Sequence, residues 1–315
     1  MGKEIQTDDI IYYITGPTAC GKTRTAVELA KLIDGEIISA DSAQVYRYMD
    51  IGTAKPDVKE MQGIRHHLID VLYPDEEYSA AIFQKMARDA VNDIRIRGKT
   101  PIVAGGSGFY LNALLYETAF SLNEPEKNAR EKYMQIASHY GNIYLHNLLQ
   151  MRDPESAAAI HANNVKRVIR ALIFYDDTGI KLSSHNAEQA KKHKPPGARV
   201  FILNMNRPLL YERINQRVDD MFDRGLVREV QKLIEMGYDE RLTSMQALGY
   251  KETIDYLKNR CNLNAAKEKI KSATRHFAKR QLTWFRNKCC GVWIDMNNLR
   301  LADLIDMAKT TSIWK

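Results

Sequence analysis

Residues 10–23 of the chain read IIYYITGPTACGKT, and the residues that follow repeat apolar side chains at helical spacing. The order is a short apolar strand, a glycine loop of the form G-x-x-x-x-G-K-T and a helix, which is the context that a phosphate-binding P-loop requires. Gly16 and Gly21 allow the backbone to turn tightly and to approach a ligand closely. The sequence therefore predicts an α/β protein organised around a polyphosphate site.

The glycine loop offers positive charge to phosphate oxygens. Its amides and the N-terminus of the following helix carry partial charge, and Lys22 adds a full charge. The Thr23 hydroxyl can join the coordination shell of Mg²⁺. We expect the whole loop to hold phosphates, namely Gly16, Pro17, Thr18, Ala19, Cys20, Gly21, Lys22 and Thr23. Taken alone, such a loop indicates a nucleotide-binding protein such as a kinase or an ATPase.

A second apolar run, around Ile37 and Ile38, predicts a buried strand with Asp41 at its carboxyl end. In open parallel sheets, ligands bind at the carboxyl ends of the strands, so we expect Asp41 near the phosphate loop. A carboxylate there can hold a metal through water or take a proton from a nucleophile. The alternative is that Asp41 only caps the next turn.

Residues 100–111, TPIVAGGSGFYL, repeat the order of strand, glycine turn and helix. The turn adds free amides and the Ser107 hydroxyl at the same edge of the sheet. A G-G-x-G pattern alone is weak evidence, but opposite the P-loop it predicts a two-sided pocket. The preceding amphipathic helix, residues 79–98, has Ser79 as its expected N-cap and Gly98 as its expected C-cap.

The middle of the chain shows helical periodicity and no strand pattern, most clearly over residues 130–140, 144–151 and 164–177. Residues 181–196 are polar and basic and end in two prolines, so we expect a mobile tail there. A strand pattern returns at residues 199–205. The prediction is a P-loop NTPase-like parallel sheet flanked by helices, formed by residues 1–114 and 200–315, with an inserted all-helical lobe at residues 115–199.

Two C-terminal helices carry basic residues at regular spacing. Arg213 and Arg217 lie four apart, on one face, where they can clamp a diphosphate or form surface ion pairs. A long helix over residues 265–288 has a mainly apolar stripe (Ile270, Ala273, Phe277, Gln281, Trp284) and a basic stripe (Lys267, Lys271, Arg275, Lys279). We expect the apolar stripe to pack on the core and the basic stripe to face phosphates. A last strand is predicted at residues 291–295, with a short helix from Leu299.

The net charge of +7 is unevenly distributed. Residues 1–114 carry 13 Lys and Arg against 16 Asp and Glu, residues 115–199 carry 12 against 9, and residues 200–315 carry 21 against 14, which gives −3, +3 and +7. A small-metabolite kinase has no need of this excess, whereas a protein that grips a nucleic acid backbone does. The alternative is a merely solvated basic surface.

Composition narrows the class and location of the protein. No apolar run approaches the roughly 20 residues that span a membrane, and the polar N-terminus lacks an apolar signal core. The four cysteines form no C-x-x-C pair, which argues against zinc and a disulfide framework and fits a reducing cytoplasm. Nothing in the sequence demands a dimer, so we expect a monomer.

A set of motifs in this order resembles the tRNA dimethylallyltransferases, also called tRNA isopentenyltransferases. The motifs are GPTACGKT, DSAQVYRYMDIGTAKP, HHLID, AGGSGFYLNALL, SMQALGYKE and RHFAKRQLTWFR, between residues 16 and 286. The set is far more specific than a P-loop alone and is closer to the bacterial form. Cys289 and Cys290 lack the partners of the zinc finger that eukaryotic relatives carry.

The resemblance implies transfer of a dimethylallyl group from dimethylallyl diphosphate to the exocyclic amine of adenosine 37 in the tRNA anticodon stem-loop. It implies that residues 18–23 bind the diphosphate with Mg²⁺ on Thr23, that Asp41 is the general base and that Arg217 contacts the diphosphate. Ser107 stands where the family usually has threonine, so the hydroxyl is kept. The implied catalytic residues are Lys22, Thr23, Asp41, Ser107 and Arg217. The implied tRNA contacts are Asp41, Ser42, Ala43, Gln44, Ser107, Arg130, Lys166, Arg167, Val168, Ile169, Arg170, Met245, Gln246, Ala247, Leu248, Gly249, Tyr250 and Lys251.

Three other functions compete with this one. An adenylate isopentenyltransferase would act on free AMP or ATP and would need no basic lobe. A nucleotide kinase or ATPase would need an arginine-bearing lid and ATP turnover. A nucleic-acid-binding module with a vestigial P-loop would not need the intact Lys22, Thr23 and Asp41.

Overall fold

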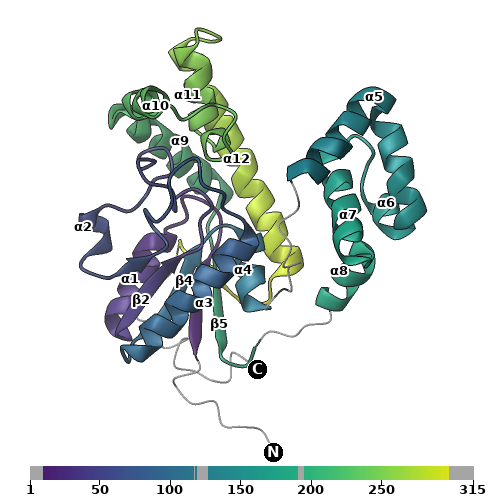
Figure 1. The fold of residues 1–315 in the computed structure, drawn as a ribbon. Coiled ribbons are helices and arrows are strands. Elements are labelled where there is room, and N and C mark those ends of the chain that lie inside the picture. The colour runs from purple at the N-terminus through teal and green to yellow at the C-terminus, as the bar shows by residue number, and fades with distance from the viewer. Residues whose placement is uncertain (1–9, 117, 119–126, 191–194, 298–315) are drawn as a thin grey trace, which may run out of the picture. The chain divides into compact units, whose positions relative to one another are not determined.

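The computed structural model describes residues 10–116, 118, 127–190 and 195–297 of the 315-residue chain. Figure 1 shows the sheet with helices around it. In the described residues its six strands are parallel and lie in the order β3-β2-β4-β1-β5-β6. The strands are β1 (Ile11–Thr15), β2 (Gly35–Ser39), β3 (His66–His67), β4 (Thr100–Gly105), β5 (Ala198–Asn204) and β6 (Val292–Asp295). The predicted α/β class with a parallel sheet is therefore confirmed.

The strand that leads into the P-loop lies in the middle of the sheet. β1 pairs with β4 on one side and with β5 on the other, with Tyr13 opposite both Val103 and Val200. Ile14 in β1 and Phe201 in β5 are 0% exposed, as expected for parallel strands that are covered on both faces. Because all the strands are parallel, the loops that follow β1, β2 and β4 lie at one edge.

Helices cover the sheet and extend beyond it. The sheet unit contains α1 (Lys22–Leu32), α2 (Val58–Met61), α3 (Ala80–Ile96), α4 (Gly108–Leu115), α9 (Arg207–Asp223), α10 (Leu226–Glu235), the 3₁₀ turn η2 (Ser244–Gln246), α11 (Tyr250–Leu257) and α12 (Leu263–Lys288). Helices α9 to α12 pack in contact with one another, and α12 also contacts α4. Ser79 caps α3 by accepting from the Ile82 amide (3.3 Å), as predicted. Gly98 adopts a left-handed φ of 70° just after the C-cap residue Arg97.

The chain divides into two compact units, residues 1–115 with 194–315, and residues 116–193. The second unit consists of α5 (Lys127–Arg152), α6 (Pro154–Ala159), α7 (Val165–Thr178) and α8 (Leu182–Ala190). It has its own apolar core, which includes Leu145, Leu149 and Leu172. Helix α5 changes direction at Gly141, where φ is 85°. Residues 195–199, which we assigned to the lobe, lie outside this unit because β5 already begins at Ala198.

The prediction of a mobile tail without regular structure over residues 181–196 is wrong for its first part, because α8 occupies Leu182–Ala190. Asp153 explains why this helix forms. Its carboxylate accepts from the Ser183 amide (2.9 Å) and the Ser183 hydroxyl (2.6 Å), while it also caps α6 through the Ser156 amide (3.1 Å). The basic residues Lys191, Lys192 and Lys194 and the predicted helix from Leu299 lie outside the described residues. Among the described residues, no helix combines the length and apolarity that crossing a bilayer needs.

Candidate active site

The P-loop follows β1 and closes onto the start of α1. Gly21 is the N-cap of α1, with a left-handed φ of 97°. Gly16 has a φ of 142°, and a Cβ on it would lie 2.4 Å from the Leu203 carbonyl oxygen of β5. Both glycines are therefore required by the backbone, as the sequence suggested. The first amides of α1 point toward the loop, as an anion site at a helix N-terminus requires.

Lys22 bends back over the loop. Its Nζ donates to the Pro17 carbonyl oxygen (2.7 Å), so the ammonium is held close to the loop backbone. Burial lowers the pKa of this ammonium, Arg217 lowers it further, and Asp41 opposes the shift. The sequence separates these three charges by many residues, and the fold brings them close enough to affect one another.

Thr18 is the meeting point of three segments. Its hydroxyl accepts from Nη1 of Arg217 in α9 (3.3 Å), and its amide donates to Oε1 of Gln281 in α12 (2.9 Å). Gln281 Nε2 in turn donates to the Gly106 carbonyl oxygen (2.9 Å), so this side chain ties the P-loop to the second glycine turn. The sequence placed Gln281 only in an apolar stripe. The sequence signal that could have singled out Gln281 is a polar side chain in an otherwise apolar stripe.

Arg217 is the arginine of α9 that reaches the loop. Besides Thr18, it contacts the Ala54 carbonyl oxygen through Nη2 (3.4 Å). Burial lowers its pKa, and the negative charge of Asp41 opposes that shift. Arg213, one turn earlier on α9, is exposed. The position expected from the family resemblance is therefore the one that touches the phosphate loop.

Asp41 follows β2 and is half-buried at the edge where the loops gather. Its Oδ1 accepts from the Ala43 amide (2.9 Å) and the Gln44 amide (3.4 Å). The alternative role of Asp41, capping the next turn, is therefore present, and it uses one of the two carboxylate oxygens. Gln44 extends the network, because its Nε2 donates to the Ala54 carbonyl oxygen (3.2 Å).

Three tyrosines lie near Asp41, two of them buried (Tyr46 and Tyr110) and one half-buried (Tyr78), and the sequence analysis assigns none of them a role. Tyr78 contacts Tyr46 and Tyr110 edge-to-face, with ring centroids 6.4 and 5.5 Å apart. Burial raises the pKa of Tyr78 and of Tyr110, and nearby charges that include Asp41 raise them further. These hydroxyls therefore stay protonated at neutral pH, within electrostatic reach of the Asp41 carboxylate.

The second glycine turn is held against β2 at very short range. A Cβ on Gly105 would lie 2.2 Å from the Ala40 carbonyl oxygen, and one on Gly108 would lie 2.3 Å from the Trp284 ring. Ser107, between them, is partly exposed at the same edge as Asp41. The turn therefore admits no side chain at Gly105 without moving β2 or β4.

We expect Gly105→Ala to lower the free energy of unfolding by about 1–3 kcal/mol, the usual cost of overpacking. Activity should fall by more than this loss of folded protein explains, because the strand ends that carry Asp41 and Ser107 are pushed apart. Thermal unfolding and turnover of the folded fraction measure the two effects. An unchanged melting temperature together with wild-type turnover would contradict the close approach.

The residues expected to touch tRNA differ in exposure. Arg130 on α5 and the basic residues Lys166, Arg167 and Arg170 on α7 are exposed in the helical unit. Gln246 and Lys251 are exposed in the sheet unit. Four side chains from the same expected set are buried in apolar cores: Val168, Ile169, Met245 and Tyr250. Any contact of these four positions with RNA falls to their backbone or their neighbours.

The prediction that the whole basic stripe of α12 faces phosphates is wrong. Lys271 forms ion pairs with Asp219 of α9 (3.0 Å) and with Glu268 (3.3 Å), and its side chain is only 15% exposed. Arg275 donates to Oδ1 of Asn215, also on α9 (2.6 Å). Only the end of the stripe at Lys279 is exposed. The stripe serves mainly to join α12 to α9, because α9 presents polar acceptors along that line.

Comparisons with known proteins give one consistent result. The IPP transferase family model matches residues 44–288. A protein of Acetivibrio thermocellus named tRNA dimethylallyltransferase is 50% identical over 288 residues, 91% of this chain and 92% of its own. The crystal structure of a tRNA delta(2)-isopentenylpyrophosphate transferase from Staphylococcus epidermidis is 44% identical, with a TM-score of 0.70 over 96% of this chain and 98% of that chain. A eukaryotic dimethylallyltransferase acting on tRNA has a TM-score of 0.81 at 31% identity, over 95% of this chain and 77% of that one.

Proposed function

The chain belongs to the IPP transferase family, and we propose that it transfers the dimethylallyl group of dimethylallyl diphosphate to the exocyclic amine of adenosine 37 in tRNA, releasing diphosphate. The observation that carries this proposal is the contact of Arg217 with Thr18 of the P-loop, in the field of the Asp41 carboxylate. The cationic side chains that a leaving diphosphate needs and the carboxylate that an amine needs as a general base thus lie at one edge of the sheet. The eukaryotic relative that acts on tRNA supports the choice of substrate.

The leaving group needs positive charge as its bond to carbon breaks. Negative charge then grows on the diphosphate, and fixed donors aimed at it lower the barrier. The loop amides, Lys22 and Arg217 are such donors, and Thr18 and Gln281 hold the loop in place. In this proposal the P-loop holds the diphosphate of an alkyl donor rather than that of a nucleotide.

The adenine amine is a weak nucleophile, because its lone pair is delocalised into the ring. It must be positioned and must lose a proton as the new N–C bond forms, which is the work of a general base. Asp41 fits this role, and its Oδ2 is the oxygen that takes the proton, since Oδ1 already accepts two amides. The adenine ring must first leave the base stack of the anticodon loop, at a cost of about a few kcal/mol.

The residues at the site fit a bound Mg²⁺. The Thr23 hydroxyl at the start of α1 and the Asp41 carboxylate are oxygen donors, and Mg²⁺ takes most of its remaining ligands from water and substrate phosphates. When bound, the metal neutralises part of the charge on the leaving diphosphate. We propose Thr23 as the protein ligand of the metal.

We also propose that the protein acts as a monomer and that it works in the cytoplasm.

The proposed function is tested by incubating the protein with Mg²⁺, radiolabelled dimethylallyl diphosphate and either unmodified tRNA or AMP. We expect label in the tRNA at adenosine 37. Label in AMP alone would favour an adenylate isopentenyltransferase. No label in either, with hydrolysis of added ATP, would favour a kinase or an ATPase.

We expect affinity for the anticodon stem-loop to fall about a hundredfold or more between roughly 50 and 200 mM salt, because bound phosphates release counterions. Replacing Lys166 and Arg167 together by glutamine should make the slope of log affinity against log salt shallower by about 1 for each lost phosphate contact. Lys258→Gln, which removes a surface ion pair with Glu240 (2.8 Å), is the matched control and should leave the slope unchanged. A flat salt response in the wild type would favour a free nucleotide as the substrate.

A further inference from the structure

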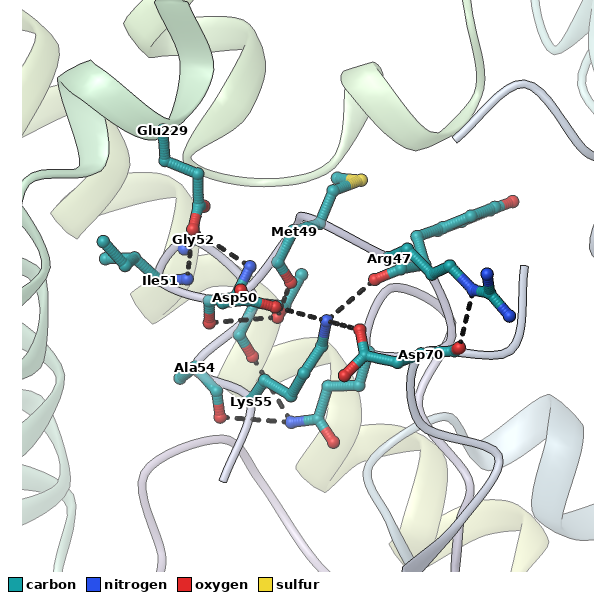
Figure 2. Close-up of polar contacts among 12 residues, drawn as sticks. Arg47, Met49, Asp50, Ile51, Gly52, Ala54, Lys55, Asp70 and Glu229 are labelled. Atoms are coloured by element: carbon teal, nitrogen blue, oxygen red, sulfur yellow. Dashed lines mark hydrogen bonds and ion pairs between the residues drawn. The ribbon is translucent and has the colours of Figure 1, made fainter. Parts of the chain in front are cut away.

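Glu229 of α10 is surrounded by hydrogen-bond donors. Its carboxylate accepts the amides of three consecutive residues, Asp50 (3.0 Å), Ile51 (2.7 Å) and Gly52 (3.1 Å), as Figure 2 shows. A fourth donor is the hydroxyl of Tyr250 (2.7 Å). Gly52 is required here, because a Cβ on it would lie 2.4 Å from the Tyr250 ring. Consecutive amides of this kind form an anion-binding concavity, and a side chain of the protein fills it.

The other end of the same loop is fixed by Lys55. Its side chain is 5% exposed, and its ammonium donates to the carboxylates of Asp50 (2.6 Å) and Asp70 and to the Tyr46 carbonyl oxygen (2.8 Å) (Figure 2). Its backbone amide also donates to the Asp50 carbonyl oxygen (3.0 Å). The segment between Asp50 and Lys55 is therefore held at both ends.

Two carbonyl oxygens of this loop, those of Thr53 and Ala54, accept from Gln44, and the one on Ala54 also contacts Arg217. The Ala54 oxygen accepts from Gln44 Nε2 (3.2 Å) and from Arg217 Nη2 (3.4 Å). Arg217 uses its other terminal nitrogen for Thr18 of the P-loop (3.3 Å). The Arg217 guanidinium therefore lies between the Ala54 carbonyl oxygen and the P-loop, in contact with both.

We infer that Glu229 is a positioning residue that orients Arg217 for the diphosphate through the 50–55 loop, an inference that rests on the proposed diphosphate site. A carboxylate is needed because all four partners are donors and a carboxylate only accepts. A carboxamide at the same place turns an N–H toward at least one of them and leaves that donor without a partner. The loop then shifts, and with it the Ala54 carbonyl.

The test is isothermal titration with inorganic diphosphate and Mg²⁺ on the full chain. We expect Glu229→Gln to weaken diphosphate binding about tenfold and to raise the KM for dimethylallyl diphosphate similarly, with affinity for the anticodon stem-loop within about twofold of wild type. Glu235→Gln, on the same helix and with the exposed Gln231 as its hydrogen-bond partner (2.9 Å), is the matched control and should bind as wild type does.

A double-mutant cycle separates positioning from a general loss of structure. In an Arg217→Ala background, Glu229→Gln should weaken diphosphate binding by less than about twofold, because its effect passes through the missing guanidinium. An equal tenfold loss in both backgrounds, or wild-type affinity for Glu229→Gln, would overturn the inference and leave the proposed function standing. A wild type that binds no diphosphate would overturn both. If Glu229→Gln does not fold, Tyr250→Phe replaces it in the double-mutant cycle, and we expect it to weaken diphosphate binding about threefold.

Discussion

Replacing Asp41 by asparagine should lower the turnover of tRNA about a hundredfold or more, in line with what a general base contributes. Asparagine keeps the side-chain oxygen that accepts the Ala43 and Gln44 amides, so the loop keeps its shape while the base is lost. Affinity for tRNA should therefore stay within about twofold. Single-turnover rates with saturating dimethylallyl diphosphate, together with RNA binding, measure the two quantities.

Comparing Asp41→Ala with Asp41→Asn separates the role of Asp41 as general base from its role in capping the next turn. Alanine loses both functions, so we expect the same loss of turnover with retained tRNA binding and, in addition, a lower melting temperature than Asp41→Asn. Asp34→Asn is a matched control, since that carboxylate is 77% exposed and pairs with Lys99 at the surface. Near-normal turnover of Asp41→Asn would remove Asp41 from the role of base.

Local sequence patterns were sufficient to predict the sheet and the phosphate loop. A P-loop needs a strand before it, a glycine at each end and a helix after it, and all of these are written within residues 10–33. The strand before Asp41 and the strand before Ser107 follow the same logic, because parallel strands bring their carboxyl ends to one edge. The places of Lys22, Asp41 and Ser107 along that edge were thus available from short segments.

Contacts between distant segments could not be predicted in the same way. Gln281 lies 263 positions from Thr18, and Glu229 lies 177 to 179 positions from the amides it accepts. Their side chains follow ordinary helical patterns, in which a glutamine or glutamate predicts only a polar face. What assigns them a role is the packing of α10 and α12, which depends on the whole fold.

The basic stripe of α12 shows how a correct pattern can lead to a wrong surface. The spacing of Lys271 and Arg275 does place them on one face, but that face lies against α9. Periodicity states which residues share a face and says nothing about what covers it. Asp219 and Asn215 on α9 are the acceptors that decide the question, and they belong to another helix.

Replacing Lys22 by methionine should lower turnover by about 10²–10³, the usual effect of removing one donor from a developing negative charge. Methionine keeps most of the length of the side chain and removes the ammonium that is held at the Pro17 carbonyl oxygen (2.7 Å). Inorganic diphosphate should also bind more weakly, while the anticodon stem-loop should bind as it does to the wild type. Lys31→Met on the same helix is the matched control, because that lysine contacts Glu28 (3.4 Å) and Gln62 at the surface.

The pH profile provides a second signature of Lys22. Burial lowers the pKa of its ammonium, and the charged form is the one that stabilises the leaving group. The charge is present below that pKa and is lost as the pH rises through it, so kcat/KM of the wild type should fall at a lower pH than an ordinary lysine would dictate. Lys22→Met should lack this fall, and Lys31→Met should keep it. An alkaline limb that persists unchanged in Lys22→Met would assign it to another group, and a turnover close to wild type would show that the loop amides and Arg217 suffice for the leaving diphosphate.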